Sequence, residues 1–378
     1  MKNPPFCPNP HCSYHTDAGR PSHWFIRKGF YATHSGNRYQ RYQCSHCQRR
    51  FSSKTFHIDY FAKVTLDYHR LLTYLVSGMS LRALGRAFHR SPKTIAGKIS
   101  ILTRQFIAFN HDNPSVVNLA EDLVADGFES YVVSQYFPNN FNLLIGKDSQ
   151  FVYDLTYAYL RRKGAMTDAQ KKLAVRYRVT DPLPAGQIQV SFTHLLRTAA
   201  GLLRVSSRKT LLILHTDEKK EYVAPLAGYA SAGLPDPLPL RILHRQTPSS
   251  VPRTGTNPLF PANYIDRDIR KDMAEHHRET VCFARNVNAS LERLTCYLFH
   301  HNFIKAFRIN RADRTFSSHA VAAGLDARFI RKRLAFLFTR RAFFTRLSLP
   351  LPGELLWRRG YFTPRKAFCD CLPAYVLA

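Results

Sequence analysis

Residues 210–222 read TLLILHTDEKKEY, in which an unbroken apolar run leads directly into a carboxylate. The apolar run at 211–214 is typical of a strand that is covered on both faces of a sheet, and Asp217 lies just beyond its end. Ligands and metals gather at such strand ends in open α/β sheets. Since a single Asp is also common in solvated turns, the significance of Asp217 depends on whether other carboxylates lie beside it.

A second carboxylate lies on an earlier predicted strand. Residues 119–133 read LAEDLVADGFESYVV, which predicts a strand that begins near Leu123 and carries Asp126. Further elements are expected before Asp217 in this order: strands at 131–133 and 143–146, then helices at 167–178 and 187–203. A β-β-β-α-β order with carboxylates on the first and fourth strands is that of an RNase H-like domain, so we expect an α/β fold with a mixed sheet and flanking helices. If those two strands are adjacent, Asp126 and Asp217 lie together.

A third carboxylate is expected from a later helix that packs on the sheet. Residues 263–270, NYIDRDIR, open this helix, and the helical stretch is expected to continue to Asn286. Asp266 lies in its first turn and Glu279 lies 13 residues later, nearly four turns away, so only one of them can face the same pair of metal ions. The remaining acids of these motifs are interpreted as solvated neighbours: Glu218, Glu221, Asp268 and Asp272.

The first fifty residues contain four of the eight cysteines. Cys7 and Cys12 form a C-x4-C pair, and Cys44 and Cys47 form a C-x2-C pair. Pairs at this spacing place two thiolates on each of two knuckles, which together complete a tetrahedral sulfur shell suited to Zn²⁺. The strands of a zinc ribbon are predicted between the pairs, at 24–27 and 38–43. Because protein fills all four positions, the site is expected to be structural and closed.

Basic side chains surround the predicted zinc site and are interleaved with aromatic residues. A small basic ribbon of this kind commonly contacts DNA, and an ordinary solvated basic face is the simpler alternative. The residues predicted to contact DNA here are Arg27, Lys28, Arg41, Arg49 and Arg50. Two histidines, His11 and His15, are spare ligand candidates, although four cysteines already satisfy a zinc ion.

Residues 66–104 change to a helical period of apolar side chains. A break before Ser80 separates the first two predicted helices, and Ser80 can cap the second. After a short turn, Ser91 is predicted as an N-cap and Pro92 as the first helical residue. This layout predicts a helix-turn-helix whose last helix enters the major groove, although any three short helices can imitate it. The predicted surface residues of this recognition helix are Lys93, Thr94, Gly97 and Lys98, and of these Lys93, Thr94 and Lys98 are predicted to contact DNA.

The overall charge points to a polyanionic partner. Lys and Arg number 55 against 26 acidic residues, and the net charge of +29 is spread along the 378 residues. Nucleic acid is the expected partner, and a basic ribosome-associated or membrane-surface protein is the alternative. Because no apolar span of membrane length and no leader pattern is visible, we expect no membrane insertion and a cytosolic location. Eight cysteines, unevenly placed, are too few for a disulfide scaffold.

Taken in order, the predicted zinc ribbon, the helix-turn-helix and the segments ADGFESYV, LLILHTDEKKEY and NYIDRDIRKDMAEHHRETVCFARN resemble a bacterial insertion-sequence transposase of the DDE type. The resemblance covers roughly residues 1–310, and its specificity comes from the ordered combination, because each motif alone is weak. It implies that Asp126, Asp217 and a third carboxylate are catalytic. In such transposases the third is typically a Glu beside an Arg, upstream of a segment that RETVCF matches here. That match places Asp266 near the catalytic position, although it is an Asp, and leaves Glu279 as the alternative.

The resemblance also implies an activity. Mg²⁺ or Mn²⁺ held by the three carboxylates would support two-metal phosphoryl transfer, first in strand cleavage and then in strand transfer. The expected partner is double-stranded DNA, as terminal inverted repeats and as target, with the chain a homo-oligomer on DNA at the bacterial nucleoid. One alternative is a non-catalytic DNA-binding regulator that keeps the ribbon and helix-turn-helix without the metal site. Another is an RNase H-like nuclease that does not join ends.

Four regions are expected along the chain: a zinc ribbon at 1–60, a helix-turn-helix domain at 61–117, the RNase H-like catalytic domain at 118–310 and a basic helical region at 311–378. Within the catalytic domain, residues 223–262 are poor in periodicity and are expected to form a loop insertion that grips DNA, unless they are a merely tolerated surface insertion. In the last region, Arg alternates with Phe and Leu, which favours contact with the DNA backbone. A membrane-surface helix is the competing interpretation there.

Overall fold

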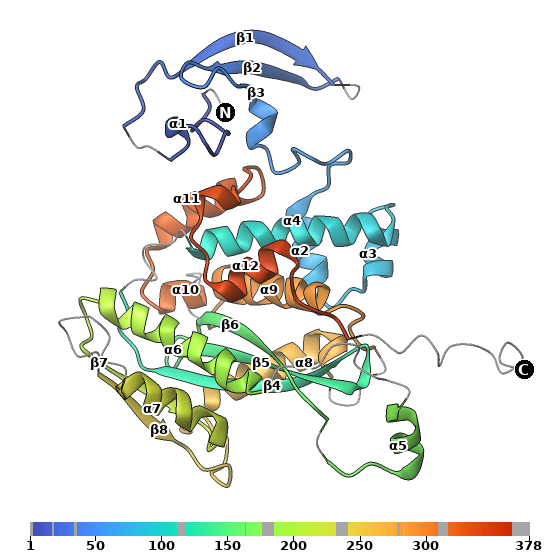
Figure 1. The fold of residues 1–378 in the computed structure, drawn as a ribbon, viewed down its shortest axis with the longest axis vertical. Coiled ribbons are helices and arrows are strands. Elements are labelled where there is room, and N and C mark those ends of the chain that lie inside the picture. Colours follow the sequence, from blue (N-terminus) through green and yellow to red (C-terminus); the bar gives the residue numbers. More distant parts are fainter. Residues whose placement is uncertain are drawn as a thin grey trace, which may run out of the picture.

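The computed structural model describes most of the chain, namely residues 3–16, 19–33, 36–111, 118–162, 164–175, 185–231, 241–277, 280, 282–308 and 317–364. Figure 1 shows a small N-terminal sheet at one end, a layer of helices in the middle and a larger sheet towards the other end. The two sheets contain three and five strands. The chain is therefore a mixed α/β protein, as the sequence predicts.

The N-terminal sheet is antiparallel, in the order β1-β2-β3. Its strands are β1 (Phe25–Ala32), β2 (Arg38–Cys44) and β3 (Arg50–Ser52), and the short helix α1 (Ser13–Thr16) precedes them. Trp24, Tyr42 and Phe51 are buried together with the cysteines in one aromatic core. The strands predicted at 24–27 and 38–43 are thus present, and the first of them extends further than its short apolar start indicates.

Three helices follow where the sequence predicts them. They are α2 (Tyr68–Val76), α3 (Leu81–Ala87) and α4 (Pro92–His111). Ser80 Oγ accepts a hydrogen bond from the Ala83 N–H at 3.2 Å, and Ser91 Oγ accepts one from the Thr94 N–H at 3.2 Å. Both predicted N-caps are therefore formed, each satisfying a backbone donor that the first turn of a helix leaves without an intrahelical partner.

These three helices share their core with α9 (Val287–Phe303), a helix that the sequence analysis does not single out. Phe106 of α4 stacks on Phe299 with ring centroids 3.9 Å apart, and Phe109 meets the same ring edge-on at 5.3 Å. Because α9 also contributes to the core beneath the larger sheet, α2 to α4 are packed onto the body of the protein.

The larger sheet has the order β6-β5-β4-β7-β8. Its strands are β4 (Leu123–Val132), β5 (Ser134–Gly146), β6 (Val152–Tyr159), β7 (Leu211–Thr216) and β8 (Arg241–Gln246). The first three strands along the chain pair antiparallel, whereas β7 is parallel to β4 and β8 is parallel to β7. The strands expected to carry Asp126 and to deliver Asp217 are therefore neighbours in the middle of the sheet.

Two details of the strand prediction are wrong. Residues 131–133 are not a separate strand, because β4 continues to Val132 and the chain reverses at Val133, whose backbone has φ 66°. The third strand is β6 instead. The region 223–262 is also more than a loop insertion, since it contains α7 (Val223–Ser231) and the edge strand β8. As an edge strand whose sequence RILHRQ mixes apolar and basic residues, β8 lacks the continuous apolar run of a central strand.

Helices cover both faces of this sheet (Figure 1). On one face, α6 (Gln187–Val205) packs against Ala125 and Leu214, as predicted for a helix at 187–203. On the other, α8 (Phe260–Asp272) and α9 pack against Val124 and Phe128. Alternate residues at the start of β4 thus enter opposite cores, which is why this strand opens with the apolar run Leu123, Val124 and Ala125. The helix expected at 167–178 is described as α5 (Asp168–Val175).

The helix that carries Asp266 begins and ends earlier than predicted. It starts at Phe260, so Asp266 lies in its second turn and not in its first. Instead of continuing to Asn286, α8 ends at Asp272, because Met273 adopts an extended backbone (φ −118°, ψ 103°) and its side chain is buried in the core of the sheet. A 3-10 turn at Ala274–His276 follows. Asn286 lies at the start of the next helix, where its Oδ1 accepts from the Ala289 N–H and caps α9.

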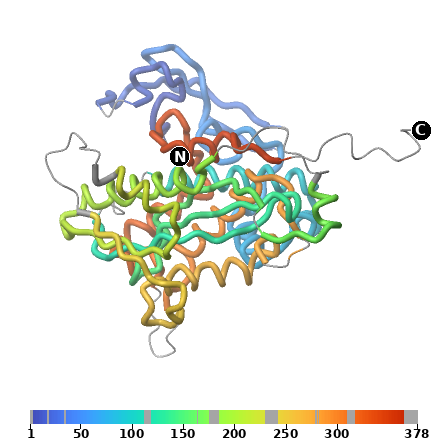
Figure 2. The backbone as a smooth tube through the Cα atoms, turned by 60° about the horizontal axis from the view of Figure 1, so that its bottom comes forward, coloured from blue at the N-terminus to red at the C-terminus, as the bar shows by residue number. Residues whose placement is uncertain are grey.

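The C-terminal region connects the N-terminal sheet to the body. Its described helices are α10 (His319–Ala322), α11 (Ala327–Leu337) and α12 (Leu351–Arg358). Between α11 and α12, the Arg341 N–H donates to Phe56 O and the Phe343 ring packs on Phe56. Figure 2 shows this red segment running between the blue N-terminal part and the helical layer. Within the described residues, every helix is too short or too polar to cross a membrane.

Candidate functional site

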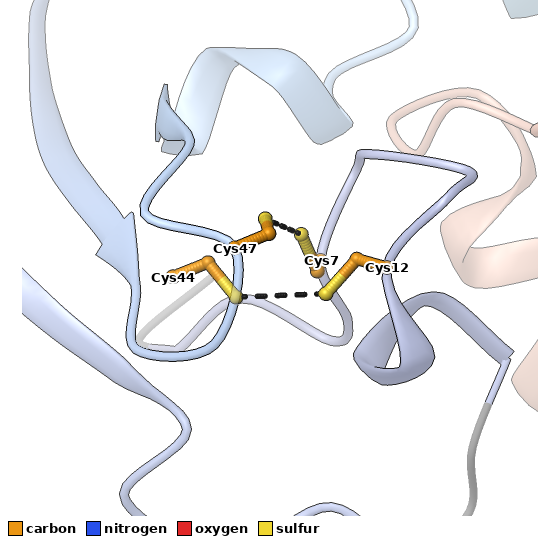
Figure 3. A group of neighbouring side chains, drawn as sticks. All are labelled: Cys7, Cys12, Cys44 and Cys47. Carbon is orange, nitrogen blue, oxygen red and sulfur yellow. Dashed lines mark hydrogen bonds between the residues drawn. The ribbon is translucent and has the colours of Figure 1, made fainter.

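The four predicted zinc ligands converge on one point (Figure 3). The ligand atoms of Cys7, Cys12, Cys44 and Cys47 all lie within 4.8 Å of one another. The Sγ atoms of Cys7 and Cys47 are 3.6 Å apart, and those of Cys12 and Cys44 are 3.8 Å apart. A tetrahedron with Zn–S bonds of about 2.3 Å has edges of roughly 3.8 Å, so this cluster can hold a structural zinc ion.

Backbone hydrogen bonds shape the two knuckles. Cys12 N–H donates to Asn9 O at 3.1 Å, and Cys44 N–H donates to Arg49 O at 3.0 Å. Burial raises the pKa of the Cys7 thiol. Burial also acts on Cys47, but hydrogen bonds, first from the Arg49 backbone, outweigh it and lower the pKa of Cys47 to about 7. A thiolate is the form that binds zinc, and the knuckle around Cys47 favours it.

Two histidines near the cluster have different roles. His15 is buried, with Nδ1 2.7 Å from Cys7 O and Nε2 2.9 Å from Thr345 Oγ1, so both ring nitrogens already have structural partners. His46 was not considered from the sequence, yet its Nδ1 lies 3.7 Å from Cys12 Sγ. Because four thiolates complete the shell, neither ring is required as a ligand.

The two central carboxylates lie side by side because their strands are parallel and in register. Leu123 pairs with Leu214, and Val124 pairs with His215. Asp126 follows Val124 by two residues, and Asp217 follows His215 by two, so each carboxylate continues the same register towards the carboxyl edge of the sheet. A gap of 91 residues in the sequence is thus closed by a single strand pairing.

Electrostatics record the proximity of these two acids. Burial and then the negative charge of Asp217 raise the pKa of Asp126 to about 6. The Gly127 N–H, which donates to Asp126 Oδ1 at 2.7 Å, opposes this rise, as do the positive charges of Lys219 and Arg253. Two carboxylates in a half-buried setting repel one another, so this site is set up to favour a proton or a cation.

The third predicted carboxylate lies on the same side of the sheet. Asp126 shares the face of Val124, which α8 covers, and Asp266 follows the buried Ile265 on α8. The buried Tyr222 lies within the field of all three acids, because burial first and then Asp126, Asp217, Glu221 and Asp266 raise the pKa of its phenol well above 10. The alternative third carboxylate, Glu279, lies outside the described residues.

The acids nevertheless do not form a closed ligand shell. Among the described residues, only the four cysteines bring three or more possible ligand atoms within 4.8 Å of one another. Asp126, Asp217 and Asp266 therefore make an open arrangement of two adjacent carboxylates with a third on the neighbouring helix. Two of the acids interpreted as solvated neighbours have structural roles instead: Asp268 pairs with Lys305 at 2.5 Å, and Asp272 accepts from the Tyr297 hydroxyl at 2.8 Å.

Sequence reasoning missed two cations at the carboxylate pair, Lys219 and Arg253. Lys219 lies in the quoted DEKKEY segment, and Arg253 lies in the region expected to grip DNA. The Nη1 of Arg253 is buried and has no hydrogen-bond partner among the described residues. A buried donor without a partner is destabilising unless something accepts from it, and a phosphate oxygen beside the acids would do so.

The predicted DNA-contacting residues are mostly on the surface. Five of them are exposed on the N-terminal sheet and its turns: Arg27, Lys28, Arg41, Arg49 and Arg50. Lys93 is exposed at the start of α4, and Thr94 is half-buried beside it. Exposure of these side chains is compatible with the predicted contact to DNA and does not test it.

The prediction for Lys98 is wrong, because this side chain does not lie on the surface of α4. Its side chain is only 4% exposed, and its Nζ lies 2.5 Å from Asp59 Oδ1 and 3.2 Å from the Tyr68 hydroxyl. It shares the inward face of α4 with Ile95 and Leu102, both fully buried. A lysine that is paired inside the protein is not available to contact a phosphate.

A scan against protein-family models and a search of curated proteins returned no match for this chain. Its function is therefore inferred from the residues themselves. The described residues offer a closed thiol cluster, an open carboxylate pair with adjacent cations, and an exposed basic surface on the N-terminal sheet. These features lie on one packed molecule, because the helices between the two sheets share their core with both α9 and the C-terminal region.

Proposed function

We propose that this protein is a DDE-type DNA transposase of an insertion sequence. The zinc ribbon and the helices α2 to α4, acting as a helix-turn-helix, would bind the ends of the element. Asp126 and Asp217, with a third carboxylate, would carry Mg²⁺-dependent strand cleavage and strand transfer. The observation that carries the proposal is the parallel register of β4 and β7, which places Asp217, just past the end of β7, beside Asp126 in β4.

Strand order and direction support an RNase H-like core. Three antiparallel strands in chain order are followed, across a helix, by a strand parallel to the first, as the β-β-β-α-β interpretation requires. Two helices, α5 and α6, lie in that crossover, and α6 covers one face of the sheet. The edge strand β8 extends the parallel part without moving the two acids from the centre of the sheet.

The donor set fits a hard divalent cation. Carboxylate oxygens are the ligands that Mg²⁺ prefers, and when bound it would supply positive charge to the attacking and leaving oxygens of a phosphoryl transfer. Asp126 and Asp217 would hold the cation together, and Asp266 is placed on the helix that faces them. Glu279 stays the alternative third acid, and Mn²⁺ satisfies the same donors.

The neighbouring cations would act on the DNA rather than on the metal. Arg253 presents a buried donor, Nη1, that a phosphate oxygen can satisfy, and Lys219 adds a second positive charge beside Asp126. Charge-assisted hydrogen bonds of this kind hold a phosphate in a fixed orientation. Asp126 and Asp217 would thus bind the cation, while Lys219 and Arg253 would orient the scissile phosphate beside it.

The test is cleavage of DNA that carries the inverted repeats flanking the reading frame. With Mg²⁺, Asp126→Asn and Asp217→Asn should each lower the cleavage rate about a thousandfold or more and leave DNA affinity unchanged. Asp154→Asn is the matched control, because burial also raises the pKa of Asp154 to about 6 on the same sheet, but its partner is Thr198 and not an acid. Asp154→Asn should cleave like the wild type.

One observation favours a second candidate, the non-catalytic DNA-binding regulator. The described acids do not converge as closely as the four cysteines do. If the wild type binds the repeats but cleaves nothing with Mg²⁺ or Mn²⁺, the regulator is the correct function. If it cleaves but never joins ends, it is a nuclease. A cleavage activity that survives both aspartate substitutions would overturn the transposase proposal itself.

A further inference from the structure

A groove lies beside α4 and includes three positions, Thr94, Gly97 and Lys98, that the helix-turn-helix interpretation assigns to the recognition surface. It has a volume of about 720 Å³ and is bounded by the linker at 58–64, by α4 and by the C-terminal segment around Arg341 and Trp357. This volume is within the range of roughly 300–1,000 Å³ that ligand sites in proteins occupy. The groove is therefore large enough to hold one nucleotide, and its lining decides which ligand it suits.

Its charge is entirely positive. The described lining includes five cations and no carboxylate, the cations being Lys63, Lys98, Arg104, Arg341 and Arg359. Two of them form ion pairs with carboxylates that do not line the groove, Lys98 with Asp59 and Arg359 with Glu292. Lys63 is exposed on the linker, and Arg104 uses its Nε to donate to Trp357 O. The rest of the lining is largely apolar and includes Ile101 and Trp357. Positive charge beside apolar surface suits a ligand that carries both phosphates and bases, as a nucleic acid strand does.

An aromatic platform stands at the edge of the groove. Phe61 is 81% exposed, which is unusual for a phenyl ring. The Tyr60 ring meets it edge-on at 4.5 Å, and the Arg341 guanidinium lies 4.7 Å from its centroid. Arg341 is itself held by its backbone hydrogen bond to Phe56. An exposed aromatic ring beside cations is what single-stranded nucleic acid binders use to stack bases.

We propose that this groove binds a single-stranded segment of DNA, with an unpaired base stacked on Phe61 and the adjoining phosphates near Lys63 and Arg104. A duplex keeps its base faces stacked on one another and cannot offer one to Phe61, so the platform selects unpaired nucleotides. The groove includes Thr94 and Gly97, next to the exposed Lys93 at the start of α4. A strand leaving a duplex bound by that helix would enter the groove directly.

This inference rests on the proposed function only in taking DNA as the partner, and it does not depend on the carboxylates. The experiment therefore uses the full chain without added Mg²⁺ and measures fluorescence anisotropy of labelled oligothymidylate. Binding of an abasic strand of equal length measures the contribution of charge without base stacking. Binding of a blunt duplex measures the affinity of the N-terminal sheet and α2 to α4 for double-stranded DNA. Loss of cleavage in a separate assay would leave these binding results unaffected, so the two proposals fail independently.

Phe61→Ala is expected to weaken oligothymidylate binding about tenfold and to leave the abasic strand and the duplex unchanged. The matched control is Phe336→Ala, since Phe336 is 41% exposed and has the Arg340 guanidinium 3.7 Å from its ring, but lies outside the groove. That variant should bind all three DNAs like the wild type.

Three outcomes would overturn the inference. In the first, Phe61→Ala binds oligothymidylate as tightly as the wild type does. In the second, the abasic strand loses the same affinity, which would mean that charge and not stacking holds the strand. In the third, Phe336→Ala matches Phe61→Ala, which would show that removing any exposed ring has this effect. A Phe61→Trp variant that keeps or gains affinity would support the stacking contact further.

Discussion

The cysteine cluster and the carboxylate pair are both groups of candidate metal ligands, but the protein builds them differently. The four thiols converge within 4.8 Å from two backbone-braced knuckles, whereas Asp126 and Asp217 are aligned by one strand pairing and Asp266 stays on a neighbouring helix. A shell filled by protein leaves no position for a substrate, while an incomplete one does. The cysteine cluster therefore suits a structural ion, and the carboxylate pair leaves room for a further ligand.

The two sites also differ in how the protein compensates their negative charge. In the cysteine cluster, a cation would neutralise thiolates that the protein holds close together, so folding and metal binding are coupled. At the carboxylate pair, the protein already supplies Lys219 and Arg253, and the pKa of Asp126 is still raised. The fold therefore tolerates a destabilising arrangement there, which is common at functional sites.

The largest expected effect comes from opening the closed site. Cys44→Ser should abolish zinc binding and unfold the N-terminal sheet, because structural zinc contributes about 10 kcal/mol or more to the folding of small zinc modules. Metal analysis and limited proteolysis of residues 3–60 would measure this. Cys282→Ser is the control, since Cys282 is exposed and outside the cluster. A Cys44→Ser protein whose N-terminal sheet stays folded and resists the protease would contradict the zinc assignment.

Replacing Asp126 is expected to change stability less than Cys44→Ser does, and to raise it. Its pKa is 3.8 in an unfolded chain and about 6 in the folded protein, so the folded state keeps this proton longer. Stability therefore falls as the pH rises from about 4 to about 6, and the whole penalty applies above pH 6. A shift of roughly two units corresponds to about 3 kcal/mol, which solvent screening of this half-buried group reduces to about 2 kcal/mol.

Asp126→Asn removes that penalty. Urea unfolding without added Mg²⁺ should show the variant about 2 kcal/mol more stable than the wild type at pH 8, with the difference shrinking towards pH 5. Added Mg²⁺ should stabilise the wild type and not the variant. A variant that is less stable at pH 8 would show that Asp126 is a structural hydrogen-bond acceptor, and the contrast between the two sites would disappear.

Arg253 tests whether the open site receives a phosphate. Replacing it with Met should lower the kcat/KM of cleavage about tenfold, because one charge-assisted hydrogen bond is lost. The same change removes a positive charge beside Asp126, so the pKa of Asp126 should rise and the pH dependence of stability should shift upwards. Arg245→Met, on the exposed edge strand β8, is the control. Equal effects from both arginines would indicate general electrostatics only.

The parts of both sites that the sequence predicts are those encoded by local patterns. Paired cysteines, the apolar runs of β4 and β7 and the caps at Ser80 and Ser91 each depend on residues a few positions apart. The parts it misses are non-local. Lys98 reads as a surface residue because its partner Asp59 lies 39 positions earlier in the chain, and Arg253 meets Asp126 only after β8 has been added to the sheet.

The smallest expected effect is at His46, and it tests whether the closed site is complete. His46 Nδ1 lies 3.7 Å from Cys12 Sγ, close enough for a weak hydrogen bond but on an exposed side chain. If four thiolates fill the shell, His46→Ala should keep one zinc per chain and change the free energy of unfolding by less than about 0.5 kcal/mol. Competition with a chelator would measure zinc affinity. A large loss of zinc affinity would mean that the imidazole of His46 binds zinc in place of one thiolate. The shell of four thiolates would then not be complete, and the contrast with the open carboxylate site would weaken.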